Sequence, residues 1–173
     1  MNISDTKETI SAEYNLEVSF YNNDKYLGII LNNNSKISKI VKFLKDNEKL
    51  RFDQLVDISA IDFPSREERF DLFYLFSSLR FNQRIAVKIS IKENDIIESI
   101  TNIYQAANWY ERECYDLFGI KFSNHPDLRR IMTDYNFEGH PLRKDFPLTG
   151  HNEVRYDDLE KKVVYEPVQL NQE

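Results

Sequence analysis

The stretch that decides the fold is Phe70-Asp-Leu-Phe-Tyr-Leu-Phe-Ser-Ser-Leu79. Its apolar residues fall on both faces of an extended chain, as in a strand from the interior of a sheet. The following run, Ile85-Ala-Val-Lys-Ile-Ser-Ile91, alternates and predicts a strand with one solvated face. Phe52 to Ile61 predicts a third strand, which Asp62-Phe-Pro-Ser65 ends. Because the links are short, we expect an antiparallel meander.

Two strands and a helix are expected before the meander. Tyr14-Asn-Leu-Glu-Val-Ser-Phe20 alternates as a half-buried strand does, and Tyr26 to Leu31 predicts a second strand. Ser35 is a natural N-cap for a helix with one apolar stripe. The stripe consists of Ile37, Ile40, Val41 and Leu44, at i, i+3, i+4 and i+7.

Two helices are expected after the meander. Asp95 and Glu98 have capping-box spacing, and so do Asn108 and Glu111. Gly119 occupies the position after the second helix where a C′ glycine belongs. The apolar residues at helical period are Ile96, Ile100, Ile103 and Tyr104 in the first helix, and Tyr110, Cys114 and Leu117 in the second.

These elements predict an α+β fold, with a mixed, mostly antiparallel sheet covered by helices and followed by a long extended C-terminal arm. We assign residues 1–12 to a flexible lead-in, 13–118 to the globular domain and 119–173 to the arm.

The arm is dense in charges, aromatics, prolines and glycines and has almost no amphipathic period. Such a stretch lacks the apolar face needed for a core of its own, while its aromatic residues argue against disorder. Pro126, Pro141 and Pro147 restrict its backbone and lower the ordering cost of association. The arm is therefore predicted to dock on another polypeptide.

Composition excludes several classes of protein. The 173 residues carry a net charge of -6, which does not suit general binding to nucleic acid. A single cysteine rules out an intramolecular disulfide. The longest apolar runs are far shorter than the roughly 20 residues of a membrane-spanning helix. The first residues show neither a signal peptide nor an Arg-rich transit pattern.

Cys114 and the three histidines could have a catalytic or zinc-binding role, or only a structural one. Cys114 and His125 lie eleven residues apart and would suit a nucleophile with its base, but the position of Cys114 beside Tyr110 and Leu117 favours a buried, inert thiol. The gaps of eleven, fifteen and eleven residues that join Cys114 to the three histidines match no structural zinc site.

Acid–base chemistry is a second alternative. Glu111 and Glu113, with His125 nearby, would suit a small independent enzyme. A structural role is favoured, because Arg112 and Asp116 have the i,i+4 spacing of a helical ion pair. The sequence contains no Gly-rich phosphate loop or nucleophile elbow. No catalytic, cofactor-binding or metal residue is assigned.

Three ordered motifs resemble one family. They are Asn108-Trp-Tyr-Glu-Arg-Glu-Cys-Tyr-Asp-Leu-Phe-Gly119, His125-Pro-Asp-Leu-Arg-Arg-Ile131 and Gly139-His-Pro-Leu-Arg-Lys-Asp-Phe-Pro147. Together they resemble the C subunit of the peripheral arm of respiratory complex I, the NADH dehydrogenase subunit 9 type. Weaker similarity runs back to Leu50 and forward to Pro167, so the resemblance covers most of the chain.

The resemblance implies a non-catalytic structural subunit in the quinone-reducing module of a proton-translocating NADH:ubiquinone oxidoreductase. The expected partners are the large subunit that helps form the quinone site and neighbouring peripheral-arm subunits. FMN and iron–sulfur clusters are expected on other subunits and none on this chain. The expected location is the matrix side of the mitochondrial inner membrane, or the cytoplasmic face of a bacterial plasma membrane. A related membrane-bound hydrogenase or photosynthetic NDH complex is the alternative assembly.

The resemblance also assigns partner-docking residues, whose charges suit ion pairs with another chain. Some of these charges are instead expected to close onto this chain's own helix, Glu111 and Arg112 foremost. The assigned residues are Trp109, Glu111, Arg112, Glu113, Asp116, His125, Pro126, Arg129, Arg130, Gly139, His140, Pro141, Leu142, Arg143, Lys144 and Asp145.

Overall fold

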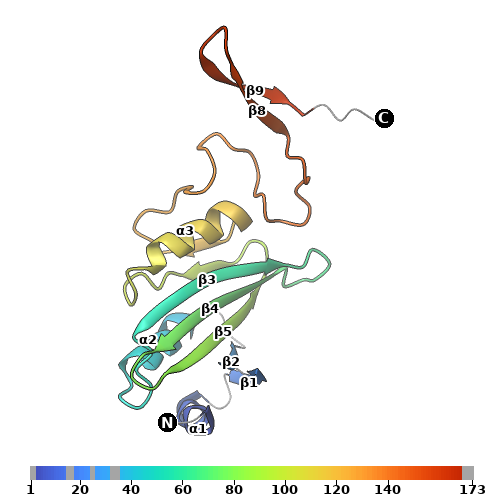
Figure 1. Ribbon diagram of the computed structural model, residues 1–173. Helices are drawn as coiled ribbons and strands as arrows, with labels where there is room; N and C mark the ends of the chain where they lie inside the picture. Colours follow the sequence, from blue (N-terminus) through green and yellow to red (C-terminus); the bar gives the residue numbers. More distant parts are fainter. Residues whose placement is uncertain (1–2, 15–17, 24–25, 32–35, 169–173) are drawn as a thin grey trace.

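The structure is a computed structural model that describes residues 3–14, 18–23, 26–31 and 36–168. It is α+β, as predicted, and its main element is a mixed five-stranded sheet (Figure 1). The strand order is β1-β2-β5-β4-β3; β2 and β5 are parallel and the other three pairings are antiparallel. The sheet consists of β1 (Val18–Asn23), β2 (Tyr26–Leu31), β3 (Gln54–Asp62), β4 (Phe70–Ser78) and β5 (Gln83–Ile91).

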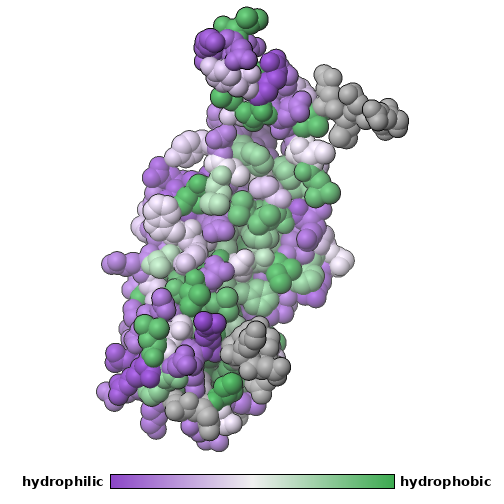
Figure 2. Space-filling model, viewed as in Figure 1, coloured by the Kyte–Doolittle hydropathy of each residue, from purple (hydrophilic) through white to green (hydrophobic). Residues whose placement is uncertain are grey.

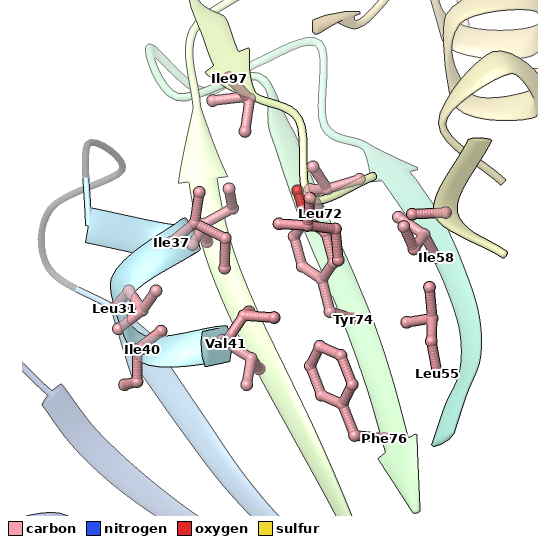
Figure 3. Packing of buried hydrophobic residues seen from close by; sticks show 14 of the residues in the cluster. Leu31, Ile37, Ile40, Val41, Leu55, Ile58, Leu72, Tyr74, Phe76 and Ile97 are labelled. Carbon is pink, nitrogen blue, oxygen red and sulfur yellow. The ribbon is translucent and has the colours of Figure 1, made fainter. Parts of the chain in front are cut away.

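The predicted meander is confirmed, and it carries most of the core. Strand β4 lies between β3 and β5, and its Leu72, Tyr74 and Phe76 are fully buried. Figure 3 shows them in one cluster with Ile37 and Val41 of α2 (Ile37–Asp46). On the second face of β4, the apolar side chains are only half-buried, so the rest of the fold does not cover them completely. Ser35, the predicted N-cap of α2, lies outside the described residues.

The chain before β2 departs from the prediction. A flexible lead-in was expected over residues 1–12, but α1 occupies Ile3–Tyr14. Tyr14, where the first strand was predicted to begin, belongs to this helix, and the described strand β1 covers Val18–Asn23. Ile10 is fully buried, and the Thr6 hydroxyl donates to Gln83 Oε1 at 2.6 Å. Only these two positions of α1 are buried, so its helical pattern is weak in the sequence.

The helix predicted from Asp95 is wrong. Ile96–Glu98 form a short strand, β6, which pairs in parallel with β7 (Lys121–Ser123). Asp95 accepts from the backbone N–H of Lys92 and caps a turn rather than a helix. The buried residues Ile97, Ile100 and Tyr104 have the spacing of one helical face, although the chain is extended at Ile97 and then forms turns. The β6–β7 pairing is long-range, so local periodicity does not reveal it.

Helix α3 (Ala107–Phe118) connects β6 to β7 and lies beside β3 (Figure 1). Its sheet-facing stripe is Ala107, Glu111, Cys114 and Phe118, all buried. The predicted Asn108–Glu111 capping box is wrong, since the helix begins at Ala107, so that Asn108 lies within it, and Glu111 accepts from the backbone N–H of Ile100. Gly119 has the predicted left-handed conformation at φ 79°, and a Cβ there would lie 2.5 Å from Arg143 Nη2.

After β7, the arm forms no helix or strand over residues 124–151, where it passes over the far side of α3, and it ends in a hairpin of β8 (Asn152–Asp157) and β9 (Lys162–Pro167). Figure 1 shows this hairpin standing apart from the main sheet, and Figure 2 shows it protruding from the body of the molecule. The domain boundary at residue 118 remains a prediction.

Candidate functional site

The buried carboxylate of Asp116 fixes the first half of the arm onto α3. Asp116 Oδ2 accepts from three consecutive backbone N–H groups, those of residues 131, 132 and 133, at 2.7–2.9 Å. Oδ1 accepts from Arg130 Nη1 at 2.7 Å and from the Thr133 hydroxyl at 2.6 Å. We call these residues the Asp116 cluster. The predicted Arg112–Asp116 pair is wrong, because Arg112 donates to the carbonyl oxygens of Arg129 and Arg130.

Hydrogen bonds within the Asp116 cluster keep the Asp116 carboxylate ionised although it is buried. Burial opposes ionisation of Asp116, but the hydrogen bonds from Thr133, Ile131 and Arg130 outweigh it and hold the Asp116 pKa below its ordinary value. The Asp116 carbonyl accepts from His140 Nδ1 at 2.8 Å. Burial lowers the pKa of His140. The arm is thus held by an ionised carboxylate whose partners all lie within this chain.

A second buried ion pair fixes the arm further along. Arg69 donates through Nε and Nη2 to both oxygens of Asp62, at 2.8 and 2.9 Å, in a bidentate pair. Arg69 also pairs with Asp145 at 2.9 Å, and Asp62 Oδ2 accepts from the backbone N–H of Lys144 at 2.7 Å. We call Asp62, Arg69, Lys144 and Asp145 the Asp62–Arg69 cluster. It joins the end of β3 and the start of β4 to residues far along the sequence.

Arg143 lies between the two clusters. It donates to the Phe118 carbonyl and to Glu93 Oε1, both at 2.6 Å. Its guanidinium carbon lies 5.3 Å from the centroid of the Phe70 ring, within cation–π range. Arg143 therefore binds this chain's own end of α3, rather than presenting its charge outward.

The structure brings Glu111 and His125 together, but inside the protein. Glu111 Oε2 lies 3.9 Å from His125 Nε2, and both side chains are fully buried. Glu111 Oε1 accepts from the backbone N–H of Ile100 at 2.8 Å, which joins α3 to the end of β6. His125 Nδ1 accepts from the Asp127 N–H, which leaves Nε2 to donate to the Asn108 carbonyl. Their inaccessibility to a substrate weighs against catalysis.

The buried Glu111 predicts a pH dependence of stability. Burial raises the pKa of Glu111 from its ordinary 4.5 to about 7. Between these values the folded chain holds a proton that the unfolded chain releases, so this residue's contribution falls as pH rises. The shift corresponds to about 3 kcal/mol. The quantity to compare is the free energy of unfolding of Glu111→Gln minus that of the original chain. This difference should rise by about 3 kcal/mol between pH 4.5 and pH 8, because the original chain loses stability over this range and the glutamine variant does not. Urea unfolding at several pH values measures this difference, and a pH-independent difference would contradict it.

Cys114 is buried, as predicted, and its thiol lies 3.4 Å from the Ile58 carbonyl, to which it donates. Burial raises the pKa of this thiol, which keeps it protonated and unreactive. Across the described residues, no three His, Cys, Asp or Glu side chains are placed to share a metal ion. Within the same part of the chain, no helix has the length and apolar character to cross a membrane.

One face of the C-terminal hairpin is apolar and exposed. On one face of the hairpin, Val154 lies opposite Tyr165, and Tyr156 lies opposite Val163. All four side chains are more than half exposed, at 58, 60, 55 and 52% respectively. The Tyr165 hydroxyl donates to Asp134 Oδ2 at 2.8 Å, which ties the hairpin to the arm. We call these four side chains the hairpin face.

A hollow of about 790 Å³ adjoins the hairpin face. Val154 and Tyr165 line one side of it, and Met132, Phe137 and Phe146 line the other. Met132 and Tyr135, which also line it, are 62 and 75% exposed. The arm therefore carries an exposed apolar surface on a backbone that the Asp116 cluster holds in place.

The sixteen assigned residues divide into inward and outward groups. Trp109 and Leu142 are exposed at 65 and 49%, and Pro126 and Arg129 are also at the surface. Glu113 and Pro141 are half-buried. Arg129 also pairs with Asp127. The other residues that bind within this chain, through the side chain or the backbone, are Glu111, Arg112, Asp116, His125, Arg130, Gly139, His140, Arg143, Lys144 and Asp145.

Asp62, Arg69 and the hairpin face were not among the residues predicted from the sequence. The hairpin has a readable signal, since Val154, Tyr156, Val163 and Tyr165 alternate with other residues on either side of a charged turn. The Asp62–Arg69 cluster has no such signal, because its members lie up to 83 residues apart.

Comparison with known proteins gives a consistent assignment. Residues 30–152 match the model of the family described as respiratory-chain NADH dehydrogenase, 30 Kd subunit. The C subunit of the NADH-quinone oxidoreductase of Ruegeria pomeroyi is 57% identical over 139 residues, which cover 80% of this chain and 70% of that protein. The Rhodospirillum rubrum protein of the same name is 57% identical over 137 residues, covering 79% of this chain and 64% of its own length.

One solved structure shows the same fold. A chain of the membrane-bound sulfane sulfur reductase, an archaeal respiratory membrane complex, superposes with a TM-score of 0.69 at 22% identity. The superposition covers 84% of this chain and 85% of that one. The family match spans well over half of the sequence and includes all three motifs. This chain therefore belongs to the family of the respiratory-chain NADH dehydrogenase 30 Kd subunit.

Proposed function

We propose that this chain is a non-catalytic structural subunit of an NADH:quinone oxidoreductase of the complex I type. It docks through its arm on the large subunit that helps form the quinone site, within the quinone-reducing module. Its relatives bear the name of the C subunit of NADH-quinone oxidoreductase. FMN, the iron–sulfur clusters and proton translocation belong to other subunits in this proposal.

The hairpin face is the observation that carries the docking role. An isolated two-stranded hairpin is marginally stable in water, and this one exposes two tyrosines and two valines on a single face. An apolar surface of this kind marks a contact with another protein. Tyrosine is also among the residue types that dominate interface energies.

The two inner clusters support docking indirectly. They order the arm through buried hydrogen bonds and ion pairs before any partner binds. A preordered segment loses less conformational entropy on association, so more of its contact energy appears as affinity. Asp116, Arg69 and Arg143 therefore act as positioning residues for the outward surface, and the sequence-based assignment of Asp116 and Arg143 to direct partner contacts is revised accordingly.

The location follows from the assembly. The relatives compared above are bacterial, so we place the chain on the cytoplasmic face of a bacterial plasma membrane or on the equivalent matrix side of a mitochondrial inner membrane. Contact with the membrane is made through the partner subunits.

A substitution on the hairpin face tests the proposal. Tyr156→Asp places a charge at the centre of the docking contact and should lower the yield of assembled complex by roughly tenfold or more. Native gel electrophoresis of solubilised membranes, with NADH:quinone activity of the assembled band, measures this effect. Glu153→Lys on the opposite face of the same strand is the matched control and should assemble normally. Normal assembly of Tyr156→Asp would contradict the proposal.

A further inference from the structure

A second surface, on the exposed side of α3, has features of a binding site that the hairpin face does not explain. Trp109 is 65% exposed although it sits on a helix whose opposite stripe is buried. It lines a hollow of about 450 Å³ beside Arg112 and Pro126. The remaining lining residues are uncharged and polar: Thr101, Asn102, Gln105, Asn108 and Asn124. We call this the Trp109 hollow.

Arg112 is the charged residue that lines the Trp109 hollow. Its Nε and Nη2 donate to the carbonyl oxygens of Arg129 and Arg130, which are neutral acceptors. Among the described residues it forms no ion pair with a carboxylate, whereas Arg69, Arg129, Arg130 and Arg143 each do. The guanidinium is thus fixed in orientation while its charge is uncompensated within this part of the chain.

The residues that line the Trp109 hollow indicate the chemistry of the segment that would bind there. Four side-chain amides can donate to and accept from a polypeptide backbone in an extended conformation. The exposed indole and Pro126 offer an apolar surface, and tryptophan and arginine are among the residue types enriched in interface hot spots. A fixed guanidinium suits a carboxylate, which it can bind bidentately.

We propose that the Trp109 hollow binds an acidic, extended segment of a neighbouring subunit, with a Glu or Asp of that segment on Arg112 and an apolar side chain on Trp109. Arg112 and Trp109 also line a second hollow, which leads along residues 130–135 to the hollow beside the hairpin face. The inference rests on the proposed function and adds a second contact, of opposite chemical character, to the apolar docking face.

Site-specific photo-crosslinking tests the inference. The probe p-benzoylphenylalanine replaces Trp109 in the full chain, the assembled complex is purified and irradiated, and the crosslinked peptide is identified by mass spectrometry. We expect one short segment of another subunit that carries a Glu or Asp. The same probe at Leu79, in the exposed turn after β4, is the control and should not reach that segment.

Charge reversal gives the second arm of the test. Arg112→Glu should reduce the crosslink from position 109 by roughly tenfold, and exchanging the partner's carboxylate for lysine should restore it. A chain that had failed to fold could not be rescued from another subunit. A crosslink within the chain itself, to lipid, to a segment without a carboxylate, or no crosslink in a complex that contains the chain would overturn the inference. Absence of the chain from the complex would overturn the proposed function instead.

Discussion

Replacing Asp116 with asparagine should lower the free energy of unfolding by about 3 kcal/mol, because one charged acceptor serves five hydrogen bonds there. Asparagine keeps the size of the side chain but removes the charge, and its amide nitrogen cannot accept. Because the amide offers one accepting oxygen in place of two, either Arg130 or the N–H groups of residues 131–133 would lose their acceptor in a largely buried place. Urea unfolding of the full chain measures the loss.

The exposed Asp127–Arg129 pair provides the control for this substitution. Its two side chains are about half exposed, and their 2.8 Å contact resembles that of Arg130 with Asp116. Asp127→Asn should therefore change stability by less than about 1 kcal/mol. The pH dependence provides a second check: the lowered pKa of Asp116 contributes stability above the ordinary aspartate range that is lost as pH falls below it. Equal stability of the Asp116→Asn variant and the original chain near neutral pH would contradict the role of the Asp116 cluster.

Arg69→Ala should have an effect of similar or larger size, about 3–5 kcal/mol, since it leaves the Asp62 carboxylate buried without its bidentate partner. Burial opposes ionisation of Asp62, and the hydrogen bond from Arg69 is the strongest factor that lowers its pKa. The substitution also removes the ion pair to Asp145, so the arm should loosen around residues 143–145.

Hydrogen exchange distinguishes the expected local loosening from a general loss of stability. The backbone amide of Lys144 donates to Asp62. In Arg69→Ala its exchange under native conditions should speed up, relative to the original chain, by more than the exchange of the β5 amides does. Arg129→Ala, which removes an exposed pair, is the control and should leave both unchanged. Unaltered protection at Lys144 would show that the Asp62–Arg69 cluster does not hold the arm.

The pattern of apolar residues along the sequence predicted the meander and α2 correctly. Helix α2 buries one continuous apolar stripe, and the strands of the meander bury most of their apolar residues, so local periodicity was enough to identify them. It failed for β6, where long-range pairing with β7 determines the conformation. Helix α1 was missed because it fully buries a single apolar residue, Ile10, which leaves no apolar stripe to read in the sequence. The family resemblance did not correct these elements, since its motifs begin at Asn108.

The arm could be recognised from sequence but its internal contacts could not. Charges at Asp116, Arg130 and Arg143 indicated ion pairs correctly, whereas the partner of each depends on how residues 119–145 fold back over α3. A charged residue has the same local pattern whether it binds its own chain or another. The hairpin face was missed because charged residues dominate the composition of the stretch that contains its valines and tyrosines.

In the proposed assembly, another subunit covers the outward surface of the arm. The decisive measurement is hydrogen–deuterium exchange of residues 152–167, compared between the purified full chain and the same chain in the assembled complex. Because the four side chains of the hairpin face are more than half exposed in the described chain, the hairpin amides should exchange rapidly in the free chain and become strongly protected in the complex. The amides of β5 should be protected in both. Equally rapid exchange of the hairpin in the assembled complex would contradict the docking role of the arm.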